Sequence, residues 1–186
     1  MTTVISHPDY LSFLAALKER ILQARTTAAR AVNRELVLLY WDIGRGIVEK
    51  QQTSGWGDAV VERLAADLRA EFPDMRGFSA RSIWEMKRLY LAWSEPEFLQ
   101  QAVAEIGEVE VLKQPEILAQ AVRELIAAVP WGHHRLILDK LTDPAARLYY
   151  LRATAKLGWS RNVLLNQIKA GAYERAVKER CIASCF

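Results

Sequence analysis

Apolar residues recur at helical spacing from Pro8 to Lys50. One stripe lies near the N-terminus and consists of Tyr10, Leu14, Leu17 and Ile21. A second stripe follows it and consists of Val32, Leu36, Leu39, Tyr40, Ile43 and Ile47. Spacings of three and four residues are typical of one face of an α-helix. The pattern therefore predicts either one long helix or two helices that are separated near Thr26 and Thr27.

Six further helices are predicted from the same periodicity, together with N-caps and prolines. They begin at or just after Asp58, Ser79, Pro115, Pro130, Asp143 and Ser160. The segment from Ala102 to Gln114 is the least helical, so we expect a loop or a short strand there, and with it the boundary between two lobes. The tail after Glu174 has no clear face for packing. The predicted fold is all-α, with seven to eight helices and little or no sheet.

A short phrase occurs twice, each time before a predicted helix. Gly77-Phe78-Ser79-Ala80-Arg81 recurs as Gly158-Trp159-Ser160-Arg161. A glycine can adopt the left-handed conformation that ends one helix, and a serine can cap the start of the next. Helix, tight turn, cap and early arginine is the layout of a helix-turn-helix. The sequence therefore predicts two helix-turn-helix-like units.

The second copy offers the better candidate for contact with nucleic acid. Asn162, Asn166 and Lys169 share one face of its predicted helix, and Arg161 lies at the N-terminus. Asparagine can pair with an adenine edge, and lysine or arginine can reach guanine or phosphate. The amides at a helix N-terminus also attract phosphate. The alternative is that this phrase only joins two packed helices, because solvated helix faces normally carry such residues.

The first copy offers Arg81 and Arg88, with Lys87 at the flank. Glu85 lies between them and would repel phosphate, so we expect this copy to support the second rather than to replace it. The net charge of the chain is +3, with +3 on residues 76–93, +4 on residues 156–180 and −4 on the remainder. A polyanion would therefore meet two basic patches on an acidic body.

Composition argues against several other classes of protein. No stretch approaches the roughly 18 apolar residues that cross a bilayer, and the N-terminus lacks the pattern of a signal peptide. Cys181 and Cys185 are the only cysteines, so no disulfide scaffold is expected and a cytoplasmic location is the default. His133 and His134 point about 100° apart on a helix, which favours packing or capping over a shared metal. We expect neither a metal nor a cofactor.

One match to an enzyme signature is interpreted as coincidence. Pro73-Asp74 followed by Glu85-Met86-Lys87 agrees, as text, with the signature of metal-dependent nucleases. That chemistry requires carboxylates that converge on a metal ion from adjacent strands. Here the aspartate follows a predicted helix, and the glutamate and lysine lie within another. We therefore predict that the chain is not itself an enzyme.

Six phrases together resemble the N-terminal module of the YhcG-type family of bacterial proteins. They are LYWDIG from Leu39, GWG from Gly55, LAADL from Leu64 running into Phe72-Pro73, GFS from Gly77, PWGHH from Pro130 and GWSR from Gly158. The resemblance covers residues 8–178, with lobes at 8–101 and 115–178. It implies a helical module that binds DNA or a partner and precedes a C-terminal nuclease domain of the PD-(D/E)XK class. It also implies a setting in DNA processing, mobile elements or phage defence.

The chain departs from this family pattern at its C-terminus. It ends at Phe186, where the family would continue into the nuclease domain. Residues 179–186 do not resemble that continuation, and we interpret them as a tail left by truncation or a frameshift. Nuclease activity is therefore not carried over.

Two functions follow as hypotheses. The first is a DNA-binding or targeting module, with double-stranded DNA as the partner and the helix after Ser160 as the contact. The alternative is a helical scaffold for protein interaction or oligomerisation. In that alternative, the stripe from Val32 to Ile47 would pair long helices in a homodimer, and a nuclease could be a further partner.

Overall fold

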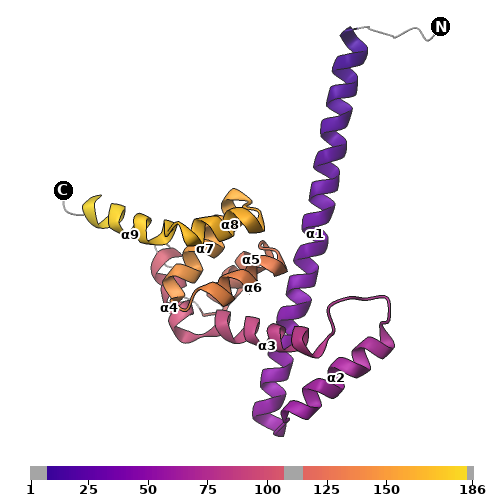
Figure 1. Ribbon diagram of the computed structural model, residues 1–186, viewed down its shortest axis with the longest axis vertical. Coiled ribbons are helices and arrows are strands. Elements are labelled where there is room, and N and C mark those ends of the chain that lie inside the picture. The colour runs from indigo at the N-terminus through magenta and orange to yellow at the C-terminus, as the bar shows by residue number, and fades with distance from the viewer. Residues whose placement is uncertain (1–7, 107–114, 184–186) are drawn as a thin grey trace.

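The computed structural model describes residues 8–106 and 115–183, and every regular element in these ranges is an α-helix (Figure 1). In chain order the helices are α1 (Pro8–Ser54), α2 (Asp58–Glu71), α3 (Ala80–Ser94), α4 (Pro96–Ile106), α5 (Pro115–Ala127), α6 (Trp131–Lys140), α7 (Pro144–Leu157), α8 (Arg161–Lys169) and α9 (Ala172–Ala183). The all-α prediction is confirmed.

Two of these helices differ from the sequence prediction. Helix α4 continues to Ile106, so the expectation of a loop or strand was wrong from Ala102 to that point. The rest of the segment, residues 107–114, lies outside the described ranges. Helix α9 occupies the tail after Glu174 and packs at its start against α7 and α8. The first turn of α9 thus has a partner that the sequence pattern does not indicate.

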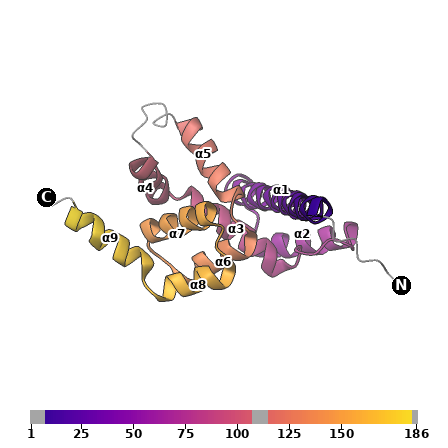
Figure 2. The ribbon, with the colours of Figure 1, turned by 90° about the horizontal axis from the view of Figure 1, so that it is seen from above.

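Helix α1 is continuous, which decides between the two alternatives that its sequence left open. It spans 47 residues, or about 70 Å. The expected weak point remains helical, and the Thr26 hydroxyl donates to the Leu22 carbonyl (2.9 Å). The C-terminal half packs against the other helices, whereas the N-terminal half projects away from them (Figure 1). Seen from above, α4 to α9 lie to one side of α1 (Figure 2).

Helices α1 and α3 cross at very close range. A Cβ atom on Gly44 would lie 2.2 Å from the Met86 carbonyl oxygen, so only glycine fits there. Close backbone approach is one of the uses of glycine in a helix, where it otherwise lowers stability. The crossing fixes α3 against the middle of the fold, and α6 packs in turn against α3.

The buried side chains form two clusters that meet at α3. The smaller cluster joins α1, α2, α3 and Phe78, and its buried members are Tyr40, Ile47, Val61, Ala65, Phe78, Ile83 and Met86. The larger cluster contains residues of α1 and of every helix from α3 through α9. Its fully buried side chains include Trp93, Phe98, Ile126, Ile137, Leu148, Leu151 and Leu164. Trp131 packs against both clusters.

Ion pairs also tie α1 to α5. Arg34 donates to both carboxylate oxygens of Glu124 (2.8 Å each), and Arg123 donates to Asp42 (2.9 Å). These contacts hold the α5–α6 corner beside the middle of α1.

The domain bounds 8–178, with lobes at 8–101 and 115–178, stay a prediction.

Candidate nucleic-acid interface

The second Gly-aromatic-Ser phrase forms a three-residue turn between α7 and α8. Gly158 has a φ of +63°, and its amide donates to the Thr154 carbonyl (2.9 Å), which ends α7. The Ser160 hydroxyl accepts from the Val163 amide (3.3 Å), which caps α8. A positive φ of this kind is readily adopted only by glycine. The predicted helix, tight turn and N-cap are therefore present at this copy.

The first phrase forms a different connection. Helix α2 ends at Glu71, and residues 72–79 separate it from α3. Gly77 has a φ of +112°, and a Cβ atom there would lie 2.9 Å from the Tyr40 hydroxyl oxygen. The Ser79 hydroxyl caps α3 by accepting from the Ser82 amide (3.2 Å), as expected. The expectation of a tight turn was wrong for this copy, because its glycine contacts α1 instead of ending α2.

One hydrogen bond and two packing contacts hold the turn before α8 in place. The His133 ring donates from Nε2 to the Trp159 carbonyl (2.9 Å), because a carbonyl can only accept. Trp159 packs against the larger cluster, and Leu164, one turn into α8, is fully buried. Burial lowers the pKa of His133, while its hydrogen bond to Trp159 raises the pKa and the charge of Arg161 lowers it. The position of α8 is thus set by α6 as well as by α7.

The far end of α8 is fastened by a buried tyrosine. The Tyr150 hydroxyl donates to the Gln167 carbonyl (3.2 Å) and accepts from the Tyr173 amide (3.1 Å), so it joins α7, α8 and α9. Burial raises the pKa of Tyr150. The Arg175 guanidinium donates to the Ala170 carbonyl just after α8. Sequence reasoning missed these contacts, because an aromatic residue within α7 is indistinguishable from ordinary core.

The four residues predicted on α8 lie on its exposed surface. Arg161, Asn162, Asn166 and Lys169 are all exposed. Across residues 8–106 and 115–183, none of the four forms a side-chain hydrogen bond or an ion pair. Asn162, Asn166 and Lys169 fall within about 60° around the helix axis, and Arg161 is one helical step away. The structure therefore brings Asn162, Asn166 and Lys169 together on one open face of α8, with Arg161 exposed at its N-terminal end on the side toward Gly132 of α6.

The basic residues of the first copy are not part of that edge. In both views α3 and α8 lie on opposite sides of α6 (Figures 1 and 2). Arg88 donates to the Asp139 carboxylate (2.7 Å) and the Leu138 carbonyl (2.6 Å), so it serves as a bridge from α3 to α6. Lys87 lies over the Trp84 ring, 5.0 Å from its centre. Arg81 is exposed in the first turn of α3.

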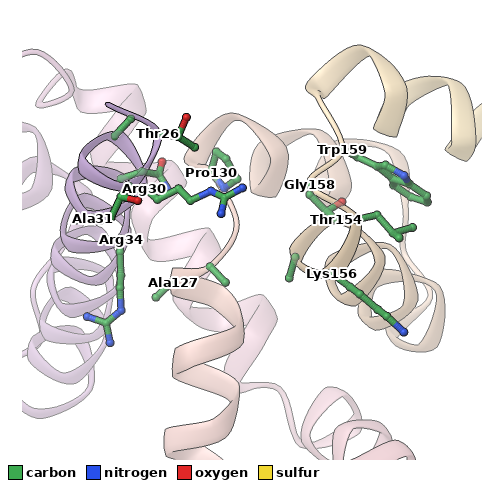
Figure 3. A pocket seen from close by; sticks show the side chains of 16 residues that line it. Thr26, Arg30, Ala31, Arg34, Ala127, Pro130, Thr154, Lys156, Gly158 and Trp159 are labelled. Atoms are coloured by element: carbon green, nitrogen blue, oxygen red, sulfur yellow. The ribbon is translucent and has the colours of Figure 1, made fainter. Parts of the chain in front are cut away.

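A groove of about 900 Å³ lies beside the turn before α8 (Figure 3). One wall is the middle of α1, with Arg30 and Arg34, and the other is the end of α7, with Lys156, and the turn after it, with Trp159. Glu124 and Glu35 already pair with Arg34. Arg30 and Lys156 have no ion-pair partner in the described part of the chain. No local sequence signal predicts this groove, because its walls are far apart along the chain.

The residues of the nuclease-like text match do not converge. Asp74 lies in the connection after α2, and Glu85 lies within α3, where Arg88 pairs with it (3.5 Å). No group of three or more His, Cys, Asp or Glu side chains that could hold a metal ion occurs among the described residues. Within the same ranges, no helix has both the length and the apolar content to cross a bilayer.

Comparison with known proteins identifies the family. Residues 16–175 match the DUF1016 N-terminal domain. The chain belongs to this family. It is also 30% identical over 165 residues to "Putative nuclease YhcG" of Escherichia coli (strain K12), an alignment that covers 83% of this chain and 43% of that relative. The resemblance to YhcG-type proteins is confirmed, and the chain spans less than half the length of this relative. No solved structure matches this chain.

Proposed function

We propose that this DUF1016 N-terminal domain is a DNA-binding or targeting module, in which the open edge of α8 contacts double-stranded DNA. One observation carries the proposal. Four polar or basic side chains, Arg161, Asn162, Asn166 and Lys169, share this exposed edge and lack partners in the described part of the chain. Because no carboxylate in these ranges pairs with Arg161 or Lys169, both charges are available to a polyanion.

The dimensions of α8 suit a groove of the duplex. Its nine residues span about 13 Å. The major groove of B-DNA is about 12 Å wide and admits an α-helix. Arg161 and Lys169, near the two ends of α8, would reach phosphates, and the asparagines between them would face base edges. The hydrogen bonds at His133 and Tyr150 hold the helix in one orientation while it binds.

The family relationship supports a nucleic-acid target. The name of the Escherichia coli relative describes a nuclease, and nucleases act on nucleic acids. The chain matches less than half of that relative. In our proposal the chain contributes binding in the cytoplasm, and a nuclease partner contributes the cutting.

Salt-dependent binding tests the proposal. Fluorescence anisotropy with a labelled duplex of about 30 base pairs would be measured between 50 and 200 mM salt. Each phosphate contact contributes about 0.9 to the slope of log affinity against log salt. The double variant Arg161→Gln with Lys169→Gln should bind more weakly and reduce that slope by about 1.8. A single-stranded competitor should displace the chain less well than duplex does.

A second double variant controls for charge alone. Arg45→Gln with Arg63→Gln removes the same charge from exposed residues of α1 and α2, where each arginine pairs with a carboxylate one turn away. This variant should keep the affinity and the slope of the original chain. Equal losses in both double variants, or no binding at 50 mM salt, would overturn the proposal. Asn162→Ala should instead change the preference among duplex sequences, since asparagine reads bases.

A further inference from the structure

The open face of α6 carries an arginine that has no acceptor in the described part of the chain. Arg135 is partly buried, and its Nε atom is buried without a hydrogen-bond partner. Across residues 8–106 and 115–183, its guanidinium forms no hydrogen bond, ion pair or ring contact. A buried donor without an acceptor is costly, and more so when it is charged. This guanidinium is therefore suited to an anion that the fold itself does not supply.

The carboxylate nearest to Arg135 along α6 is already used. Asp139 is the only acidic residue of α6, and it lies one turn after Arg135, about 40° around the axis. It accepts from Arg88 of α3 (2.7 Å) instead, and Arg88 also pairs with Glu85 (3.5 Å). The charges of Arg88 and Asp139 thus offset each other, whereas the charge of Arg135 is not offset within its own helix.

Arg161 lies against the same part of α6. A Cβ atom on Gly132 would lie 4.0 Å from the Cδ atom of Arg161. Gly132 is nearly one turn before Arg135, and a helical side chain covers the turn that is N-terminal to its own Cα atom. We therefore expect Arg135 to extend over the turn that Arg161 contacts. Two guanidinium groups, one from α6 and one from α8, then border the same patch of surface.

The charges around this patch favour an anion. Neither Arg135 nor Arg161 pairs with a carboxylate within the described ranges. Arg161 is also the first residue of α8, where the helix dipole adds positive potential. His133 contributes no charge near neutral pH, because burial lowers its pKa. Like charges that lie close together repel each other, and a bound anion of high charge would reverse that repulsion.

We propose that Arg135 and Arg161 bind two neighbouring phosphate groups. The inference rests on the proposed function for their source, since there they belong to one strand of the duplex that α8 contacts. Arginine suits this task because its planar guanidinium can donate two hydrogen bonds to one phosphate. Consecutive phosphates of a strand advance 3.4 Å along the duplex, and Gly132 and Arg135 are about 4.5 Å apart along α6. The two spacings are of the same size.

A phosphate contact from α6 would determine where α8 lies on the duplex. Contacts to phosphates fix the register and orientation of a protein, whereas contacts to base edges specify the sequence. The hydrogen bond from His133 to Trp159 joins α6 to the turn before α8. Arg135 on α6 is therefore linked through the backbone to the asparagines of α8, and we assign it a positioning role in DNA binding.

The salt dependence of duplex binding tests the role of Arg135. Arg135→Gln should weaken binding and lower the slope of log affinity against log salt by about 0.9. Lys140→Gln is the matched control, because it removes one exposed charge from the last turn of the same helix, and it should leave the slope unchanged. Arg135→Lys should keep most of the slope but bind less tightly, since lysine keeps the charge and loses the planar fork.

Thermal unfolding checks that a loss of binding is not a loss of folding. Arg135→Gln removes a partly buried charge that has no partner in the described part of the chain, so its unfolding temperature should not fall. Pyrophosphate, which links two phosphate groups, probes the site without DNA. At constant ionic strength it should raise the unfolding temperature of the original chain and of Lys140→Gln, and should have less effect on Arg135→Gln.

The outcomes separate this inference from the proposed function. An unchanged duplex slope in Arg135→Gln, when Arg161→Gln with Lys169→Gln lowers the slope, overturns the inference and leaves the proposed function standing. If no duplex binds at 50 mM salt, the proposed function fails and pyrophosphate decides. Stabilisation that is lost in Arg135→Gln and kept in Lys140→Gln then supports a phosphate site with another source of phosphate. Equal stabilisation of both variants overturns the site.

Discussion

The Nε2 atom of His133 lies 2.9 Å from the carbonyl oxygen of Trp159, which joins the first turn of α6 to the turn before α8. The ring donates this hydrogen bond from its neutral form, since burial lowers the pKa of His133. Arg161 follows two residues after Trp159. The orientation of the candidate DNA-binding edge therefore depends on a side chain that need not touch DNA.

Replacing His133 should loosen α8 without changing its charge. His133→Ala removes one partly buried hydrogen bond, so we expect the free energy of unfolding to fall by about 1–2 kcal/mol. Amide exchange from Val163 to Leu165 should accelerate, and affinity for duplex DNA should fall several-fold with an unchanged salt slope. Urea unfolding, hydrogen exchange and anisotropy measure the three effects. A reduced salt slope would mean instead that His133 contacts phosphate.

His134 should make the stability of the fold depend on pH. Its ring is fully buried and donates from Nε2 to the carbonyls of Ile126 (2.9 Å) and Val129 (3.1 Å). Burial lowers the pKa of His134 from 6.5 to about 4. As the pH falls below 6.5, the unfolded chain binds the proton first. The free energy of unfolding should therefore fall between pH 6.5 and 4, by about 3 kcal/mol in total from this group.

Comparison with a neutral side chain isolates the contribution of His134. His134→Gln keeps an amide that can donate to the same carbonyls but cannot titrate. Urea unfolding at pH 7 and pH 5 should show a smaller difference for this variant than for the original chain. An equal difference in both proteins would assign the pH dependence to other groups.

The elements that the sequence predicts well are those fixed by local chemistry. Asp143 and Ser160 cap α7 and α8 as expected. An N-cap side chain accepts a hydrogen bond from an amide two or three residues later, so this contact needs no distant segment. The continuity of α1 was left open, because threonine weakens a helix only slightly. Helix α4 was missed, because the periodicity beyond Ala102 is weak and its packing on α7 comes from a distant segment.

The candidate site was predicted in part for the same reason. The exposed edge of α8 follows from the spacing of residues within one helix. The role of Arg88 does not, because Asp139 is 51 residues away in the sequence. The same is true of Arg34, whose partner Glu124 is 90 residues away. Local patterns show which residues share a face, whereas tertiary packing determines which charges are already paired.

Arg88 should contribute to stability and not to DNA binding. It bridges α3 to the Asp139 carboxylate and the Leu138 carbonyl. Arg88→Met keeps the aliphatic stem, so we expect a loss of about 1 kcal/mol in the free energy of unfolding. Affinity for duplex DNA should stay within two-fold. A double-mutant cycle with Asp139→Asn measures the coupling energy between Arg88 and Asp139. A large loss of DNA affinity in Arg88→Met would show instead that Arg88 contributes to the DNA interface.

Two glycines of α1 should respond in opposite ways to alanine. A Cβ atom on Gly44 would lie 2.2 Å from the Met86 carbonyl oxygen, whereas one on Gly46 would meet nothing within 4 Å. Gly44→Ala should therefore force α1 and α3 apart and cost about 2 kcal/mol or more. Gly46→Ala should stabilise the helix by about 0.5–1 kcal/mol. Thermal and urea unfolding measure the stability of the two variants. Equal changes in the free energy of unfolding would contradict the close crossing of α1 and α3.

Alanine substitutions at Gly158 and Gly55 distinguish the cost of a left-handed backbone conformation from the effect of the turn before α8 on DNA binding. Its φ is +63°, close to the +65° of Gly55 at the far end of α1, and a Cβ atom would meet nothing within 4 Å at either position. Alanine should therefore cost a similar amount at both sites, about 1 kcal/mol or more, through backbone strain alone. Only Gly158→Ala should also weaken binding to duplex DNA, because only that turn sets the direction of α8. Gly158→Asn should restore part of the stability and part of the affinity, since asparagine tolerates this conformation better than alanine. Equal effects of Gly55→Ala and Gly158→Ala on DNA affinity would separate the turn from binding.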